Sequence, residues 1–218
     1  MCAVSVTELH DLFAALAIAA MAGTVALVVL KVVSFAAPNA FTFRALDLAH
    51  KVQLPLAALV ATVTTLGSLY FSEYGLMWEP CRFCWFQRIF MYPSAVLLLV
   101  ATIRRDRNVK WYVGALSVIG LLISGWHNLL EHRIVEESAA CSASGPPCAS
   151  PNWVSFGTFG YDKNGFYTTG FPITLAVMAF TAFAFILALL FLPEPLDTLD
   201  TLDTSDTLED GNGEPAAG

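Results

Sequence analysis

Five long runs of apolar residues constrain this chain more than any other feature of its sequence. Four of them contain no charged residue, and the third contains a single charge, Arg88, near its start. A helix needs roughly 20 such residues to cross the hydrocarbon core of a bilayer, and a segment in lipid must satisfy its backbone hydrogen bonds internally. The sequence therefore predicts an all-α, polytopic membrane protein. The predicted spans are residues 12–30, 52–72, 85–103, 111–130 and 172–192.

Composition agrees with this fold class. Hydrophobic residues make up 56% of the 218 residues and charged residues only 13%, a combination that is rare in soluble domains of this size. The first run has an alternative interpretation, because an uncleaved, signal-like anchor would show the same pattern. No small-residue cleavage site follows a short apolar region there, which disfavours a signal peptide that is removed.

The positions of Lys and Arg predict the orientation of the spans. Four bases lie within residues 104–110, and three more lie in the connector between the first two runs. Loops rich in these residues are typically cytoplasmic, so alternation places residues 72–84 and 131–171 on the outer face. With five spans, the N-terminus is predicted outside and the C-terminus inside. The three bases of the first connector are Lys31, Arg44 and Lys51.

The formal charge of −7 arises mainly from the end of the chain. Eight of the eighteen acids follow Pro193, in a stretch that repeats Asp-Thr-Leu and contains no aromatic residue. Such a composition predicts a disordered, solvated tail over residues 193–218, although a docking tail is an alternative. No basic cluster indicates nucleic-acid binding.

The cysteines form two spaced pairs at the ends of predicted spans. One pair is a Cys-x-x-Cys motif at the start of the third run, and the other lies in a polar loop before the last run. On the oxidising side of a membrane these pairs predict disulfide chemistry. Haem attachment is disfavoured because Trp85 stands where a His would be required, whereas a zinc site that uses four cysteines remains an alternative. The five cysteines are Cys2, which we interpret as incidental, and Cys81, Cys84, Cys141 and Cys148.

The start of the third run favours a reactive thiol. Pro80 and Cys81 come at the expected helix start, so Cys84 falls in or near the first turn, where unpaired N–H groups and the helix dipole stabilise a thiolate. Arg88 lies four residues further on and shares the helix face of Cys84. Its guanidinium favours the thiolate and offers donors to a carbonyl oxygen of a bound ring. The alternative is an Arg that reaches the outer headgroups.

The loop pair, Cys141 and Cys148, brackets a short polar segment. Gly145, Pro146 and Pro147 favour a turn that brings the two thiols together. A structural disulfide that only staples the loop is one interpretation. An exchangeable disulfide fits better, because the loop is small, polar and expected to be exposed.

These residues resemble a known family. Glu79-Pro80-Cys81, Cys84-Trp85-x-Gln87-Arg88, Met91-Tyr92-Pro93 and the later pair together resemble the disulfide bond formation protein B family, including its BdbC-type members. The resemblance covers roughly residues 52–192. It implies a membrane four-helix bundle, in a prokaryotic cell membrane, that reoxidises an extracytoplasmic thioredoxin-like thiol oxidase. It also implies electron transfer to the membrane quinone pool, either ubiquinone or menaquinone.

The resemblance further implies a role for each cysteine. Cys81 and Cys84 would be the quinone-coupled pair, with Cys84 as the thiolate that contacts the quinone and Arg88 polarising the quinone. Cys141 would form the mixed disulfide with the partner oxidase, and Cys148 would relay electrons to Cys81. No metal is expected.

Two further polar residues are candidates for the quinone site. Gln87 lies within a turn of Cys84 and could reach a quinone oxygen, although a helix–helix hydrogen bond explains it equally well. His127, near the outer end of the fourth run, could line the pocket or transfer protons. A position at the membrane interface explains His127 almost as well.

The predicted organisation has three parts. Residues 1–50 form an N-terminal transmembrane helix and a cytoplasmic connector, residues 51–192 form the bundle with two outer cysteine-bearing loops, and residues 193–218 form the acidic cytoplasmic tail. The extra N-terminal run and the six-residue spacer between the loop cysteines depart from the family pattern.

Two alternative functions remain. One is a quinone-coupled enzyme of the vitamin K epoxide reductase type, in which the order of the pairs is usually reversed. The other is a non-enzymatic, tetraspan-like scaffold with a stapled outer loop.

Overall fold

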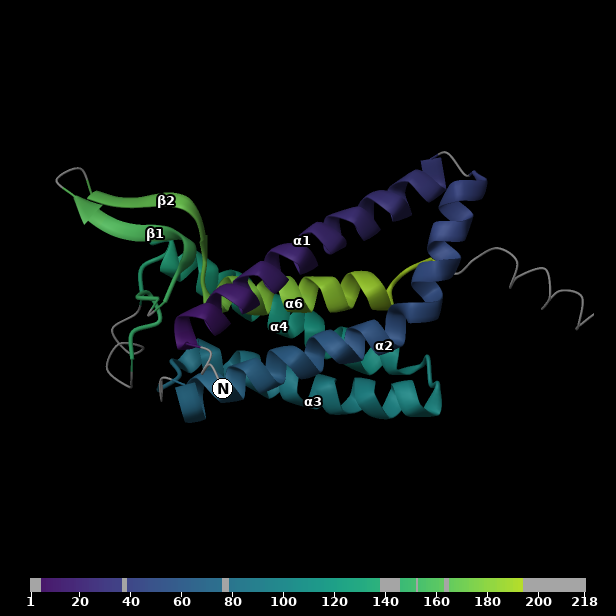
Figure 1. Cartoon of the computed structure of the whole chain (residues 1–218), viewed down its shortest axis with the longest axis horizontal. Helices are drawn as coiled ribbons and strands as arrows, with labels where there is room; N and C mark the ends of the chain where they lie inside the picture. Colours follow the sequence, from purple (N-terminus) through teal and green to yellow (C-terminus); the bar gives the residue numbers. More distant parts are fainter. Residues whose placement is uncertain are drawn as a thin grey trace, which may run out of the picture.

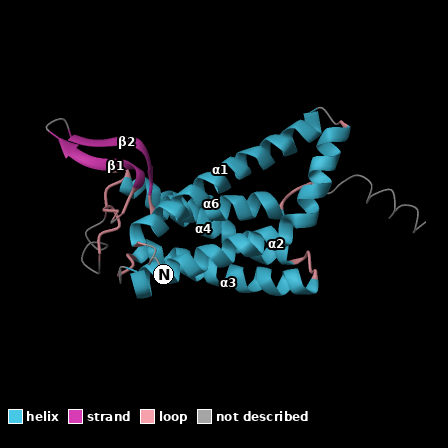
Figure 2. Ribbon diagram, viewed as in Figure 1, coloured by secondary structure: helices cyan, strands magenta, loops and turns pink. Residues whose placement is uncertain are grey.

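The computed structural model describes residues 5–36, 39–75, 79–137, 146–151, 153–162 and 165–193. These residues form a helical bundle with one β-hairpin projecting from one end (Figures 1 and 2). Cys2, Cys141 and residues 194–218 of the predicted acidic tail lie outside the described residues. The helices are α1 (Val6–Ala36), α2 (Ala40–Tyr70), α3 (Arg82–Arg104), α4 (Val109–Glu131) and α6 (Leu175–Leu190), with a π-helical turn η1 (Phe71–Gly75), and the strands are β1 (Ser155–Asp162) and β2 (Gly165–Ile173).

Each predicted span corresponds to a helix. Helices α1, α2 with its π-helical extension, α3 and α4 are long and apolar enough to cross a membrane. Helix α6 is shorter, with 16 residues. It begins at Leu175 rather than at Pro172, because Pro172 and Ile173 belong to β2 and Thr174 caps the helix. The fold class predicted from the sequence is confirmed, and the chain is a multi-pass membrane protein.

Capping residues determine where the first two helices begin. Helix α1 starts six residues before the apolar run, since Ser5 and Glu8 exchange backbone–side-chain hydrogen bonds of 2.8 and 3.2 Å. Asn39 and Thr42 form the same reciprocal capping box at the start of α2. Each box satisfies two backbone donors that a helix leaves unpaired. Polar residues just before an apolar run are therefore part of the helix.

The predicted connector between the first two spans is mostly helical. Lys31 lies in α1, and Arg44 and Lys51 lie in α2, so these bases belong to helices rather than to a free loop. Figure 1 shows that α2 is bent. Pro55 lies inside this helix and supplies a reason, because proline lacks an N–H and its ring clashes with the preceding turn.

Small residues allow the helices to approach one another closely. The main core cluster contains Ala57, Ala61 and Ala95, each at most 4% exposed, and the fully buried Phe183. Phe183 lies so close to Gly120 that a Cβ there would be 2.3 Å from the ring. Helix association in lipid depends on such close packing, since lipid is as apolar as the side chains. Helices α4 and α6, α2 and α3, α3 and α4, and α1 and α6 all pack together in this way.

The segment before α6 folds as an antiparallel hairpin. The sequence predicts only an outer loop here, without strands. Strands β1 and β2 pair from Ser155 with Ile173 to Asp162 with Gly165, with an irregularity between Ser155 and Gly157. Gly170 adopts a φ of 69°, and a Cβ on Gly157 would meet the β2 backbone at 2.6 Å. The glycines therefore permit a close backbone approach at the base of the hairpin.

The two ends of the bundle differ in chemistry. The starts of α1, α3 and α6, the end of α4 and the hairpin lie at one end (Figure 1). The turn between α3 and α4, which carries the basic residues 104–110, lies at the other end. Helix α3 stops there because Arg105 adopts the left-handed conformation, with φ 56°.

Candidate functional site

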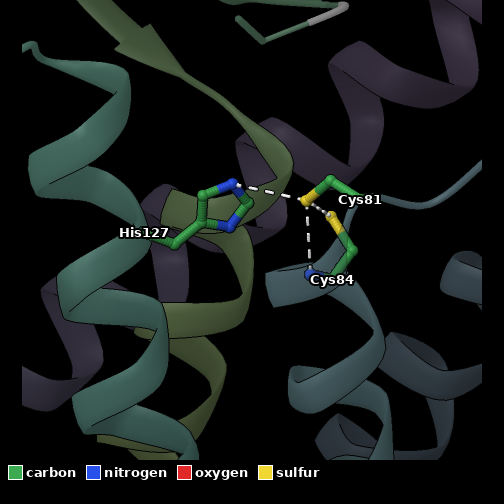
Figure 3. Close-up of side chains that lie close together, drawn as sticks. All are labelled: Cys81, Cys84 and His127. Atoms are coloured by element: carbon green, nitrogen blue, oxygen red, sulfur yellow. Dashed lines mark hydrogen bonds between the residues drawn. The ribbon is translucent and has the colours of Figure 1, made fainter. Parts of the chain in front are cut away.

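The Cys-x-x-Cys motif opens α3. Cys81 is the N-cap residue, and its Sγ accepts a hydrogen bond of 3.4 Å from the backbone N–H of Cys84. The two sulfurs lie 3.1 Å apart (Figure 3). Cys84 thus sits in the first turn, where the sequence analysis expected it, and shares the unpaired N–H groups of the helix start.

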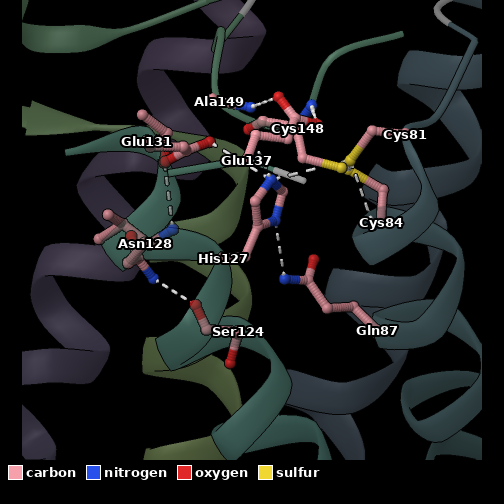
Figure 4. A network of polar contacts seen from close by, with 12 residues as sticks. Cys81, Cys84, Gln87, Ser124, His127, Asn128, Glu131, Glu137, Cys148 and Ala149 are labelled. Atoms are coloured by element: carbon pink, nitrogen blue, oxygen red, sulfur yellow. Dashed lines mark hydrogen bonds and ion pairs between the residues drawn. The ribbon is translucent and has the colours of Figure 1, made fainter. Parts of the chain in front are cut away.

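The loop after α4 brings Cys148 to the same place. Figure 4 shows the Cys148 side chain directed toward the sulfurs of Cys81 and Cys84. The thiols of Cys148 and Cys81 are hydrogen-bonded, and both side chains are buried. The carboxylate of Glu137 accepts hydrogen bonds from the backbone N–H groups of Cys148 and Ala149, at 2.9 and 3.3 Å. Glu137 therefore holds the loop in position.

The surroundings keep two of these thiols protonated. The hydrogen bond with Cys148 lowers the pKa of Cys81, but the contact with Cys84 and burial raise it more, to about 12. The hydrogen bond with Cys81 and burial raise the pKa of Cys148. Only the thiolate is a nucleophile, so Cys81 and Cys148 become nucleophilic only when cleavage of a disulfide releases one of them as a thiolate.

His127 of α4 links the motif to the loop. The Gln87 amide nitrogen lies 3.2 Å from Nδ1, which therefore accepts, so the ring proton belongs on Nε2. Nε2 donates to the Cys148 carbonyl oxygen at 3.2 Å and lies 3.7 Å from the Cys81 Sγ. The ring stacks on Phe83, with centroids 5.6 Å apart. Gln87 and His127 thus bind each other and bridge α3 and α4.

Glu131 extends this polar cluster into the bundle. One carboxylate oxygen lies 3.8 Å from the His127 Nε2, and the other accepts a 2.6 Å hydrogen bond from the Thr174 hydroxyl. Both carboxylate and hydroxyl belong to buried residues. Glu131 was not singled out from the sequence, although its spacing of four residues from His127 places both on one helix face. Nothing in the sequence indicated Thr174 as its partner.

Arg88 lies one turn below Cys84. Its Nη2 donates to the Ser68 carbonyl oxygen of α2 at 3.3 Å, and its guanidinium carbon lies 5.3 Å from the Trp85 ring centre. These contacts hold the cation inside the bundle rather than directing it to the headgroups. Arg88 also lines the adjoining cavity.

A cavity of about 480 Å³ adjoins these residues. Most of its wall is apolar, and it is formed by α1, α2, α3 and α6, with polar groups gathered at the end near the cysteines. This size and lining suit a small organic ring with an apolar tail. The predicted site residues that line it are Cys81, Cys84, Gln87, Arg88, His127 and Cys148. Cys141 lies outside the described residues.

The same side chains also have the geometry of metal ligands. The ligand atoms of Cys81, Cys84 and His127 all lie within 4.8 Å of one another. Thiolate and imidazole ligands at such spacing suit Zn²⁺. Cys148 would supply a third thiolate to such a site, but the apolar cavity beside the sulfurs has no part in structural zinc binding, so thiol–disulfide exchange accounts for more of the arrangement.

Comparison with known proteins identifies the family. The model of the family "Disulfide bond formation protein DsbB" matches residues 50–193. A probable disulfide formation protein of Deinococcus radiodurans is 41% identical over 141 residues, which is 65% of this chain and 88% of that protein. A probable disulfide formation protein C of Halalkalibacterium halodurans is 36% identical over 140 residues, which is 62% of this chain and 90% of that protein.

A further relative is the disulfide bond formation protein C of Bacillus subtilis, which is 41% identical over 99 residues, or 44% of this chain and 71% of that protein. No solved structure matches the chain. The matched residues include α3, α4 and the three clustered cysteines, Cys81, Cys84 and Cys148. They do not include α1. The chain is an oxidoreductase of disulfide bond formation and belongs to the DsbB family.

Proposed function

We propose that this protein is a thiol:quinone oxidoreductase that reoxidises an extracytoplasmic, thioredoxin-like thiol oxidase. One observation carries the proposal: three cysteine sulfurs gather at the polar end of an apolar cavity inside a membrane bundle. A structural disulfide would need neither the third sulfur nor the cavity. A vitamin K epoxide reductase-type enzyme is disfavoured by the family match.

The reaction balances two electrons and two protons. The partner's dithiol becomes a disulfide, and the quinone, whether ubiquinone or menaquinone, accepts both electrons and both protons to become a quinol. The electrons pass through the Cys141–Cys148 pair and then the Cys81–Cys84 pair. Each exchange requires a thiolate that attacks one sulfur of a disulfide and expels the other sulfur as a thiolate.

The placement of Cys148 supports a direct relay to Cys81. After the partner attacks Cys141, the released Cys148 thiolate attacks the Cys81 sulfur beside it and expels Cys84. A thiol with a low pKa leaves faster than one with a high pKa. The pKa of Cys81 is about 12 in this environment, which makes Cys81 a poor leaving group. Attack on the Cys81–Cys84 disulfide therefore releases Cys84, the sulfur next to Arg88, as the thiolate.

Arg88 and His127 supply charge and protons at the quinone site. The guanidinium, fixed by the Ser68 carbonyl, stabilises the Cys84 thiolate and donates to a ring carbonyl oxygen. His127 holds a proton on Nε2, and Glu131 lies 3.8 Å from that atom. These two groups form a proton route between the sulfurs and the cavity. Gln87 orients the imidazole through Nδ1.

The proposed setting is a prokaryotic cell membrane. The cysteine end of the bundle faces outward, where the partner oxidase acts, and the acidic tail is cytoplasmic. The basic turn at the opposite end supports this orientation, because such turns remain in the cytoplasm.

Quinone reduction by a purified dithiol partner tests the function. Wild-type protein in lipid nanodiscs is mixed with an excess of a reduced thioredoxin-like oxidase and of ubiquinone-1. The protein should then reduce many equivalents of the quinone. Cys84→Ser should abolish turnover, because the sulfur that faces the quinone is lost, while Cys2→Ser should retain the wild-type rate. Loss of turnover in both variants, or in neither, would contradict the assigned role of Cys84.

A spectrum gives an independent readout. A thiolate held against a quinone ring should add a visible absorption band when ubiquinone-1 binds, and the band should be absent in Cys84→Ser. If both proteins show the same spectrum, the thiolate that contacts the quinone is not Cys84.

A further inference from the structure

Helix α1 forms one wall of the cavity. It lies before residues 50–193, which match the family, yet Phe13, Leu16, Ala17 and Ala20 line the same space as Cys84 and Arg88. Helices α2 and α6, against which α1 packs, form other walls of the cavity (Figure 1). The cavity in this chain is therefore bounded in part by a helix that the family match does not include.

Buried hydrogen bonds fix the start of α1 to the hairpin. His10 is 1% exposed, and its Nδ1 lies 2.7 Å from the Ser155 hydroxyl, which donates in turn to Asp11 at 2.6 Å. Because Ser155 uses its one proton for Asp11, it accepts from His10. Ser155 begins β1 and follows the loop of Cys148 by a few residues, so this network places α1 against the segment that carries the relay cysteine.

Aromatic packing closes the gap between α1 and α2. The Phe13 ring lies over Gly67, and a Cβ added to Gly67 would be 2.5 Å from that ring. The Phe13 ring also packs edge-on against Phe71, with the ring centroids 5.6 Å apart. Phe13, Gly67 and Phe71 all line the cavity. Further along the helix, Gly23 packs equally closely on Phe185 of α6. Helix α1 therefore packs closely against both α2 and α6.

We infer that α1 is a specificity-determining wall of the quinone site, against which the ring and the start of its apolar tail pack at Phe13, Ala17 and Ala20. The inference rests on the proposed quinone function. Small side chains at Ala17 and Ala20 leave room beside α2 and α6 for an isoprenoid tail. A bulky residue on this face would fill that room, whereas the same residue on the lipid-facing side of α1 would not.

A matched pair of substitutions tests the wall. Ala17→Phe places a ring in the cavity, and Ala15→Phe places the same ring on the exposed side of the same helical turn. We expect Ala17→Phe to raise the KM for ubiquinone-1 about tenfold, equivalent to a modest loss of binding energy. The KM for the reduced partner protein should not change. Ala15→Phe should match the wild type in both constants. Equal quinone KM values in the two variants would overturn the inference.

Photolabelling of the wild-type protein gives a second measurement that needs no substitution. An azido-substituted ubiquinone, activated by light in nanodiscs and mapped by mass spectrometry, should label the peptide that contains residues 13–20. Labels confined to α2, α3 and α6 would refute a wall formed by α1. A wild-type protein that reduces no quinone would refute the proposed function instead, so the two failures are distinguishable.

Discussion

The carboxylate of Glu137 is one of the groups that hold Cys148, the proposed relay cysteine, in place. The described residues around Cys148, 146–151, form no helix or strand, and such a segment needs side-chain contacts to hold one conformation. Glu137 provides them by accepting from two successive backbone N–H groups. Hydrogen bonds to a charged acceptor contribute about 1.5–3 kcal/mol each. The distance between Cys148 and Cys81 therefore depends on a residue that takes no part in the electron transfer.

Removal of Glu137 should slow the internal relay. In Glu137→Ala the loop loses both contacts, and we expect transfer from the partner to the Cys81–Cys84 pair to slow about tenfold, since misplaced reacting atoms lose rate steeply. Single-turnover mixing with the reduced partner, followed by acid quench, measures this step. The quinone KM should stay unchanged, because Glu137 does not line the cavity. The neighbouring exposed Glu136→Ala serves as the control. Equal relay rates in the two variants would show that the loop is held by other contacts.

Three of the candidate site residues share one helix, and their spacing in the sequence predicts this. Cys84, Gln87 and Arg88 are close in sequence, so helical periodicity alone predicts that they lie near one another. It could not predict that Gln87 pairs with His127, or that Glu131 pairs with Thr174, because these contacts depend on how separate helices pack. Gln87 makes the helix–helix hydrogen bond that was one of its two predicted roles, and it also lines the cavity, so its predicted contact with a quinone stays a prediction.

At the scale of helices, the contact between α4 and α6 depends on Gly120. The Phe183 ring fills the space above this glycine and is itself fully buried, so it cannot move aside easily. We expect Gly120→Ala to destabilise the bundle by about 1–3 kcal/mol through overpacking, despite the better helix propensity of Ala. The readout is the midpoint of thermal unfolding in detergent.

Gly125→Ala in the same helix is the matched control. Its added Cβ would meet the Phe180 ring at 3.5 Å, an ordinary van der Waals distance. This variant should unfold at or slightly above the wild-type temperature. If Gly120→Ala were as stable as Gly125→Ala, close packing at Phe183 would not govern this interface.

Apolar runs predicted the helices well but not their ends. The run of α1 begins at Leu12, whereas the helix begins at Val6. The additional turn carries His10 and Asp11, which anchor α1 to the hairpin. Hydropathy could not show this, since a polar residue extends a helix when capping and tertiary hydrogen bonds satisfy it. The hairpin was not predicted because glycines interrupt both strands and leave only a weak alternating pattern.

At the scale of the molecule, the bundle separates its chemistry between two ends. The cysteines, His127 and the hairpin lie at one end, and the turn rich in arginine lies at the other (Figure 1). An enzyme that takes electrons from an extracytoplasmic protein must expose the first end outside. A basic turn resists translocation across the membrane, so both ends favour the same orientation.

Cysteine accessibility in intact cells tests this orientation. In a background with all native cysteines replaced by Ser, Thr158→Cys marks the hairpin and Asn108→Cys marks the basic turn, and both positions are exposed. A membrane-impermeant maleimide should label Thr158→Cys in intact bacteria that express the protein. Asn108→Cys should react only after lysis. The reverse pattern would place the three sulfurs on the cytoplasmic side, where thiols are kept reduced, and a role in recharging an extracytoplasmic oxidase would then be impossible.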